Sequence, residues 1–475
     1  MGDTEAMTSR RGFLKALGCG AVGWALPGLL RAARRSTKRP NFVLFLVDDL
    51  GWRDLGCYGS TFYETPHIDR LCRDGTKFTQ AYAAGSVCSP TRASIITGRY
   101  PARTGCTNWG GRIKGTEFPL ARAFRDGGYD TFFAGKWHIG NMTPSQAGFQ
   151  VVASGIKPDP KTDPKATRAI TAAATQFLRS RKGKPFLAFV SYFAVHTPLR
   201  ESADVVEKYR RKLARQPKPR GPAFEPEHDR KNKLIQDDPA FAAMTEVMDD
   251  SVGRIVAAVK DIGAADDTVV IFFSDNGGLS TKPCTANRPL RAGKGWLYEG
   301  GIREPLITKW PGVTKPGSTC DTPVVSTDFF PTMLEMAGLP LRPKDHCDGV
   351  SLAGLLRTGK LPAREAIYWH YPHRHGAGNR PSGAIRLGDW KLIQYFGTGT
   401  VELYNLRNDL GERKDLAGRM PQKRDELLRR LEAWRKSIPG IRFGQPQQRG
   451  KGKRRKQTEP TARQAEVTAE PGALT

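Results

Sequence analysis

Three apolar segments without polar alternation are the clearest structural signal along the chain. They are rich in Val, Leu, Ile and Phe, and they occupy residues 41–47, 185–193 and 268–274. A continuous run of this length is typical of a strand buried on both faces, as in a parallel sheet. Between these runs, residues 66–74 and 239–262 have apolar positions at helical spacing, and a glycine follows each. The alternation predicts an α/β fold with a mostly parallel sheet flanked by helices.

The pattern changes after about residue 360. Short strand-like segments separated by turns are followed by an amphipathic helix; the strands are expected at 367–371, 383–387, 390–396 and 401–406, and the helix at 422–436. We therefore expect a main α/β domain at 38–360, a C-terminal subdomain with a small antiparallel sheet and a helix at 361–440, and a basic disordered tail at 441–475. The charged, proline-rich segment 200–236 is predicted to be a surface insertion.

The first 35 residues have the pattern of an export signal. Arg10 and Arg11 precede an apolar stretch at 16–30, which is shorter than the roughly 20 residues that a membrane-spanning helix needs. The string S-R-R-x-F-L-K resembles a twin-arginine signal, and an ordinary secretory signal is the alternative. A lipid anchor at Cys19 is disfavoured by the residues before it. We expect a periplasmic or secreted protein that uses the twin-arginine export machinery and has no stable membrane anchor.

The charge of the chain narrows the class of binding partner only slightly. The formal charge of +28 favours polyanions, which include nucleic acid, acidic lipid and sulfated polysaccharide. We expect no nucleic-acid partner, because the sequence contains no recognised nucleic-acid-binding motif.

The eight cysteines show no C-x-x-C spacing, which argues against a structural zinc site. Export would permit disulfides, and Cys320 with Cys347 is one candidate pair.

Acidic and amide side chains follow two of the predicted strands directly. Asp48 and Asp49 come after the run at 41–47, and Asp275 and Asn276 come after the run at 268–274. Ligands of open α/β sheets bind beyond the carboxyl ends of the strands, so we expect these side chains to converge. Oxygen ligands suit Ca²⁺ or Mg²⁺. Either pair alone would be explained as a strand-ending turn; the two together favour a metal site.

Cys88 begins the string C-S-P-T-R-A-S-I-I-T-G-R. Ser89 is a good N-cap, Pro90 fits the first helical position, and Gly98 fits the helix stop. Cys88 is therefore predicted at the positive end of a short helix, where an anion is stabilised, with Arg92 one turn further on. A simply buried thiol and a thiolate nucleophile of lowered pKa are the alternatives.

The string resembles the signature of the sulfatase family, in which the cysteine of C-x-P-x-R is oxidised to formylglycine by a separate maturation enzyme. The resemblance runs from about residue 40 to about residue 417 and includes D-D at 48–49, G-C-Y-G at 56–59, T-P-H-I-D-R-L at 65–71, G-K-W-H-I-G at 135–140, H-T-P at 196–198, S-D-N-G-G at 274–278 and G-K-G-W-L-Y-E-G-G-I-R-E-P at 293–305. It implies the alkaline phosphatase/sulfatase-like fold, with a large mixed, mostly parallel sheet. Y-W-H-Y-P-H is similar to the arylsulfatase A-like and N-acetylgalactosamine-6-sulfatase-like branches.

The resemblance also implies which residues form the site. One calcium ion would be bound by Asp48, Asp49, Asp275, Asn276 and the group at residue 88. Arg92 would steady the residue-88 group, and Lys136 and His138, which alternate at strand spacing, would flank it. His196 and Lys294 would contact the sulfate and its bridging oxygen. Alone, such a lysine or histidine is more often a surface charge or a structural residue, so these assignments depend on the flanking motifs.

Two further assignments concern the surroundings of the site. Ser154 is a candidate for the serine that the family places after its K-x-H motif. His370, with His373 and His375 in W-H-Y-P-H-R-H-G, is assigned to a loop at the cleft rim that contacts substrate. A second metal site at these histidines is the weaker interpretation, because their spacing matches no usual zinc pattern.

The sequence thus predicts a sulfuric ester hydrolase that acts on a sulfated carbohydrate or an aryl sulfate through a formylglycine gem-diol at residue 88. His138 would be the base that allows sulfate to leave, His196 with Lys294 would protonate the leaving alcohol, and Asp275 would help activate the attacking hydroxyl. The alternatives are a phosphodiesterase or phosphonate hydrolase of the same superfamily and a non-catalytic sulfoglycan-binding protein.

Overall fold

The computed structural model describes residues 39–441, apart from 154–155, 282–283 and 363. The expected export signal at 1–35, the candidate Ser154 and nearly all of the expected basic tail lie outside the described residues. No helix in the described part of the chain is long and apolar enough to cross a membrane.

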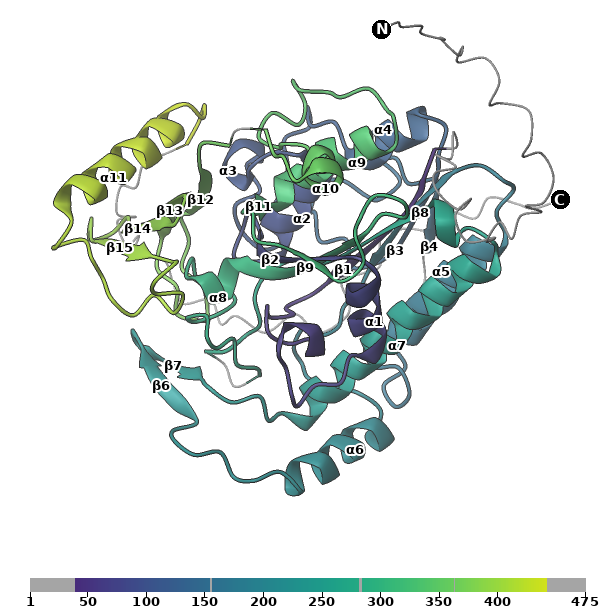
Figure 1. Ribbon diagram of the computed structural model, residues 1–475, viewed down its shortest axis with the longest axis horizontal. Coiled ribbons are helices and arrows are strands. Elements are labelled where there is room, and N and C mark those ends of the chain that lie inside the picture. Colours follow the sequence, from purple (N-terminus) through teal and green to yellow (C-terminus); the bar gives the residue numbers. More distant parts are fainter. Residues whose placement is uncertain (1–38, 154–155, 282–283, 363, 442–475) are drawn as a thin grey trace, which may run out of the picture.

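A mixed β-sheet lies at the centre of the described part of the chain (Figure 1). Its nine strands are β1 (Asn41–Val47), β2 (Thr76–Tyr82), β3 (Asp130–Gly135), β4 (Val151–Ala153), β5 (Phe186–Ser191), β8 (Thr268–Ser274), β9 (Arg303–Lys309), β10 (Ser318–Cys320) and β11 (Val324–Val325). The order is β10-β2-β9-β8-β1-β5-β3-β4, with β11 paired to β2. Strand β9 runs antiparallel to both of its neighbours, and the other pairs are parallel. The predicted α/β fold with a mixed, mostly parallel sheet is confirmed.

Helices cover both faces of this sheet. In Figure 1 one layer contains α1 (Pro66–Asp74), α5 (Thr167–Arg179) and α7 (Pro239–Asp261), and the other contains α2 (Cys88–Thr97), α4 (Leu120–Asp126), α9 (Phe329–Met336) and α10 (Ala353–Thr358). Alternate residues of β1 point to opposite faces, so Val43 and Phe45 join the first core while Phe42 and Leu44 join the second. A strand with a core on each side needs apolar residues throughout, which is the pattern that its sequence shows.

A smaller antiparallel sheet forms from the C-terminal segments. Its strands are β12 (Ile367–Tyr371), β13 (Ser382–Leu387), β14 (Trp390–Tyr395) and β15 (Val401–Asn405), and α11 (Pro421–Lys436) packs against them (Figure 1). These elements lie within one or two residues of their expected positions. A domain boundary at about residue 360 stays a prediction.

The remaining elements connect these layers. They are α3 (Pro101–Thr104), α6 (Ala203–Ala214), α8 (Glu299–Ile302), the hairpin β6 (Phe224–Glu227) and β7 (Arg230–Lys233), and the short 3₁₀ turns Gly56–Tyr58, Ala265–Asp267 and Ser326–Asp328. Helix α6 and the hairpin occupy the segment expected to be a surface insertion. Among the described residues Cys320 and Cys347 are both free, so the candidate disulfide between them is not formed.

A buried lysine joins the small sheet to α8 and to the segment that follows β15. Lys391 on β14 is fully buried, and its Nζ lies 2.9 Å from Glu299 Oε1 and 2.8 Å from Glu412 Oε1. Glu299 begins α8, and its backbone N–H donates to Glu412 Oε2 at 2.6 Å. Two buried carboxylates therefore share one ammonium group. Removing that group would take away the ion-pair partner of Glu412 and leave Glu299 paired with Arg303, whose Nη1 lies 3.2 Å from Glu299 Oε2.

Replacing Lys391 by methionine, which fills a similar volume without charge, is expected to lower the free energy of unfolding by about 3–5 kcal/mol, because Glu299 and Glu412 stay buried. Urea unfolding followed by tryptophan fluorescence measures the change. The exposed Lys414 offers the control, since Lys414→Met should leave stability almost unchanged. Equal stability of the two variants would contradict the role given to Lys391.

Candidate active site

The two acidic segments meet at the carboxyl edge of the large sheet. Strands β1 and β8 are parallel neighbours with Val47 paired to Ser274, so the residues that follow them lie side by side. The backbone N–H of Asp49 donates to Asp275 Oδ1 at 3.2 Å, and Asn276 Nδ2 donates to Asp49 Oδ1 at 2.8 Å. The backbone of Asp49 is left-handed, with φ of 62°. Asp48, Asp49, Asp275 and Asn276 are all buried, so the convergence expected from strand-end positions is present.

A cation from a different segment faces each carboxylate of this cluster. Arg92, on α2, donates from Nε to Asp275 Oδ2 at 2.8 Å, and Lys136, just past β3, places Nζ 2.5 Å from Asp48 Oδ2. Lys294 places Nζ 2.7 Å from Asp49 Oδ2. The three acids, Arg92 and Lys294 are buried, and the side chain of Lys136 is 11% exposed.

Burial and the nearby cations act in opposite directions on the cluster's acids. Burial favours the neutral carboxyl at Asp48, but Lys136 and the charges beside it prevail and hold the pKa of that carboxyl below its usual range. The balance is the same at Asp49, where Lys294 is the largest opposing charge and the pKa is lowered. At Asp275 burial exceeds the effect of Arg92, so the pKa is raised to about 7.

The oxygen atoms of this cluster suit a hard divalent cation. In the part of the chain that the structure describes, Asp48 Oδ1 and Asn276 Oδ1 are buried without a hydrogen-bond partner. Donor atoms of Asp48, Cys88 and Asp275 lie within 4.8 Å of one another, and so do those of Asp48, Asp49 and His196. Unsatisfied buried oxygens are costly, and a bound cation would satisfy them. The cluster therefore fits the expected metal.

Cys88 lies in the first turn of α2 rather than before it. The helix begins at Cys88 after an extended Val87, so the predicted N-cap at Ser89 is wrong. Ser89 Oγ instead accepts a hydrogen bond from the backbone N–H of Gly110 at 2.8 Å, which draws a separate loop to this turn. Gly98 ends the helix as predicted, in the left-handed conformation with φ of 65°.

The thiol of Cys88 is buried next to the acidic cluster. Only 2% of the residue is exposed. Burial, followed by the carboxylate of Asp48, raises the pKa of the thiol to about 11. The group is thus a neutral thiol near pH 7, which argues against the thiolate nucleophile considered from the sequence.

His138 and His196 approach the cluster from two loops. Strand β3 ends at Gly135, and His138 has a left-handed backbone with φ of 62°, so the expected strand alternation of Lys136 and His138 is wrong. Burial and then Lys136 lower the pKa of His138 to about 3, which leaves its imidazole neutral. His196 Nδ1 is hydrogen-bonded to Thr197 O at 2.6 Å, and its Nε2 lies 3.8 Å from Asp49 Oδ2.

The histidines of the C-terminal subdomain do not gather at one point. His370 packs against Phe396, 5.2 Å between ring centroids, in a hollow that Arg435 also lines, and the structure does not bring it to the acidic cluster. The next residue, Tyr371, points to the other face of β12 and donates to Asn108 Oδ1 at 3.3 Å. The metal-binding groups found among the described residues do not include His370, His373 or His375.

Two polar residues that the sequence reasoning missed hold this cluster together. Ser191 Oγ accepts from Arg92 Nη1 at 2.6 Å and donates to Lys136 O at 2.7 Å. Lys165 is buried and donates from Nζ to His196 O at 2.6 Å. Ser191 had a signal, because it ends a predicted central strand, whereas Lys165 lies in a polar stretch with no motif around it.

Comparison with known proteins agrees with this geometry. The sequence matches the family described as Sulfatase over residues 40–339, and the family described as N-sulphoglucosamine sulphohydrolase, C-terminal, over residues 292–437.

Individual relatives cover most of the chain. A sulfatase of Formosa agariphila is 30% identical, with 84% of this chain and 89% of that protein aligned, and human arylsulfatase A is 28% identical, with 85% and 88% aligned. The crystal structure of Ps i-CgsB in complex with k-i-k-neocarrahexaose superposes with a TM-score of 0.70 at 27% identity, covering 84% of this chain and 93% of that one. The chain therefore belongs to the sulfatase family of sulfuric ester hydrolases.

Proposed function

We propose that this protein releases inorganic sulfate from a sulfated carbohydrate, using a formylglycine formed from Cys88 and one bound Ca²⁺. The observation that carries the proposal is the place of Cys88. Its sulfur lies within 4.8 Å of carboxylate oxygens of Asp48 and Asp275. Arg92 pairs with Asp275, Lys136 pairs with Asp48, and Lys294 pairs with the neighbouring Asp49. The acids of such a cluster can bind a metal ion, and the cations beside them can bind a tetrahedral anion next to that metal.

Calcium would be held by Asp48, Asp49, Asp275 and Asn276, together with the group at residue 88. The ion supplies a positive charge that polarises a sulfate oxygen and offsets the developing negative charge. Formylglycine, in its hydrated form, supplies a hydroxyl for attack on sulfur and a second hydroxyl whose deprotonation lets sulfate leave.

The lysines of the cluster bind the sulfate group in this proposal. Lys136 and Lys294 are held by Asp48 and Asp49 through single ion pairs, and their Nζ groups have further hydrogens to donate. The charge balance of the cluster supports this role. Each of its three carboxylates already has one cation beside it among the described residues. An added divalent ion therefore leaves an excess positive charge that an anionic ester would compensate.

The histidines move protons. His138 is neutral, so a ring nitrogen accepts the proton that leaves the residue-88 hydroxyl during release of sulfate. The negative charge of a bound sulfate would counter Lys136 and Arg92 and raise the pKa of His138 toward neutrality. His196 is the donor to the leaving alcohol, with Lys294 beside the same carboxylate, Asp49. The hydrogen bond from Nδ1 to Thr197 O would leave Nε2 to carry that proton.

The substrate class rests on two comparisons. The match over residues 292–437 is to the C-terminal part of an enzyme named for N-sulphoglucosamine, and Ps i-CgsB was crystallised with an oligosaccharide, k-i-k-neocarrahexaose. Both names point to sugars. We also propose that the protein is exported through the twin-arginine signal in residues 1–35 and is matured by a formylglycine-generating enzyme.

Intact-mass and peptide mass spectrometry of active protein test the modification. The peptide containing residue 88 is expected to be about 18 Da lighter than the unmodified cysteine peptide, because a thiol group is replaced by an aldehyde. The peptide containing Cys106, another buried cysteine, serves as the control and keeps its thiol mass. An unmodified thiol at residue 88 in fully active protein would contradict the proposal.

A screen of sulfated saccharides with release of inorganic sulfate as the readout tests the reaction. We expect turnover of at least one sulfated saccharide and of aryl sulfates, with lower kcat/KM on the matching phosphate esters. Faster hydrolysis of phosphate diesters or phosphonates would favour the phosphonate hydrolase alternative. Binding of a sulfated saccharide without release of sulfate would favour a non-catalytic binding protein.

A further inference from the structure

Trp109 is the most exposed large hydrophobic side chain in the described part of the chain. It is 64% exposed, whereas other exposed residues of this class range from 38% for Phe193 to 49% for Leu341. An indole buries a large apolar area when it meets a partner, so leaving one in solvent forgoes stability. An exposed aromatic ring indicates a binding site when its neighbours provide independent evidence for one.

The loop that carries Trp109 is fixed at three points, one beside Cys88 and two in the C-terminal subdomain. Gly110 N–H donates to Ser89 Oγ at 2.8 Å, and Ser89 directly follows Cys88. Thr107 Oγ1 and His373 Nε2 are 2.9 Å apart, and Asn108 Oδ1 accepts from the hydroxyl of Tyr371 at 3.3 Å. These bonds come from α2 and from the C-terminal subdomain, so the indole stands on a braced loop between the two.

The indole also lies beside a catalytic candidate. The ring centroids of Trp109 and His138 are 6.5 Å apart, with an angle of 45° between the ring planes. His138 in turn lies among the charges of Lys136, Arg92 and Asp48. The exposed indole is therefore at the edge of the cluster that would hold the sulfate.

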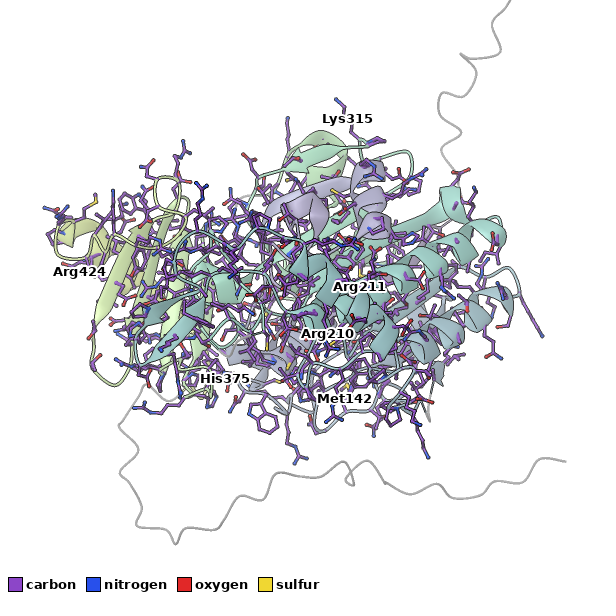
Figure 2. All side chains as sticks on the ribbon, turned by 90° about the horizontal axis from the view of Figure 1, so that it is seen from below. Met142, Arg210, Arg211, Lys315, His375 and Arg424 are labelled. Carbon is purple, nitrogen blue, oxygen red and sulfur yellow. The ribbon has the colours of Figure 1, made fainter. Side chains whose placement is uncertain are left out.

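The C-terminal subdomain reaches the same region at a second point. A Cβ on Gly295 would lie 2.4 Å from His375 Nδ1, so the imidazole packs directly over the residue that follows Lys294. Figure 2 labels His375 and Met142, and both lie toward the lower edge of that view. Met142 O accepts a hydrogen bond from Trp137 Nε1 at 2.5 Å, which places it next to the loop of Lys136 and His138.

We propose that Trp109 is a stacking platform for a sugar ring of the substrate, next to the subsite that takes the sulfate group. The apolar C–H face of a pyranose would pack on the indole and remove both surfaces from water, while the hydroxyls stay hydrated. The platform supplies binding to the carbohydrate, and the cationic cluster supplies binding to the sulfate. This inference rests on the proposed sulfatase function and adds the element that selects a sugar.

The test compares Trp109→Ala, Trp109→Phe and the wild-type enzyme on a sulfated saccharide that the wild type hydrolyses. Loss of an aromatic contact should raise KM for the saccharide roughly five- to ten-fold while kcat changes less than about two-fold, and phenylalanine should recover part of the loss. Inhibition by inorganic sulfate, which reaches only the cationic cluster, should be unchanged. Leu341→Ala, at another exposed apolar residue, is the control and should behave as wild type.

The outcomes separate the two proposals. Sulfate release by the wild type with an unchanged KM in Trp109→Ala would overturn the platform and leave the sulfatase function standing. A fall in kcat together with weaker inhibition by inorganic sulfate would also overturn it, because that result indicates a structural role at His138. If the enzyme hydrolyses aryl sulfates but no sulfated saccharide, Trp109 is not a platform for a sugar ring of the substrate. Absence of sulfate release from every ester tested would remove the proposed function itself.

Discussion

Replacing Cys88 by serine or alanine is expected to reduce sulfate ester turnover by roughly 10⁴-fold or more, the order seen when an enzyme loses its nucleophile. A serine hydroxyl in the same position would form a stable alkyl sulfate, which offers no easy route to release. A hydrated aldehyde has a second hydroxyl for that purpose. Initial rates on an aryl sulfate, with protein concentration fixed by absorbance, measure the loss.

The fold should survive this substitution. Cys88 is buried without a disulfide, so a change to alanine removes one small side-chain atom from a packed site, and the midpoint of thermal unfolding should move by only a few degrees. Cys106→Ala is the matched control, because Cys106 is also buried and free but is not in the acidic cluster. Wild-type turnover in Cys88→Ala would refute the role of residue 88.

Local sequence patterns predicted the core strands and the acidic edge well. Strands β1 and β8 begin and end where their apolar runs do, since a strand packed on both faces leaves its mark at every residue. The meeting of Asp48 with Asp275 then followed from a rule about parallel strand ends. Such features are encoded by neighbouring residues and are readable without a structure.

Features that depend on distant segments were not predictable in the same way. Ser89 has the pattern of an N-cap, yet its hydroxyl is used by Gly110, a partner 21 residues away. His370 and Tyr371 are adjacent, and the register of β12 against β13 decides which of them faces Asn108. Lys165 is drawn to His196 O by the tertiary fold. A shift of one residue in the pairing register moves every side chain of a strand to the opposite face, and the local sequence does not determine that register.

Calcium is expected to stabilise the protein through the acidic cluster. Thermal unfolding of protein treated with EDTA should shift to higher temperature as Ca²⁺ is added, by an amount equivalent to about 2.7 kcal/mol at a hundredfold excess over Kd. Turnover should fall by roughly 10²-fold or more after chelation and return with Ca²⁺, because a bound cation contributes several kcal/mol to charge stabilisation. Differential scanning calorimetry gives the first measurement independently of activity.

Two carboxylates in the same stretch make a matched pair for this test. Asp48→Asn removes a charge that faces Lys136, so the cluster becomes more positive and should lose its response to Ca²⁺. Asp54 is also buried, but burial raises its pKa to about 7, and it accepts hydrogen bonds from Gly51 N–H and Thr285 Oγ1. Asp54→Asn imitates its neutral form and should keep the full Ca²⁺-dependent shift. An Asp48→Asn protein that still gains stability from Ca²⁺ as the wild type does would place the ion elsewhere.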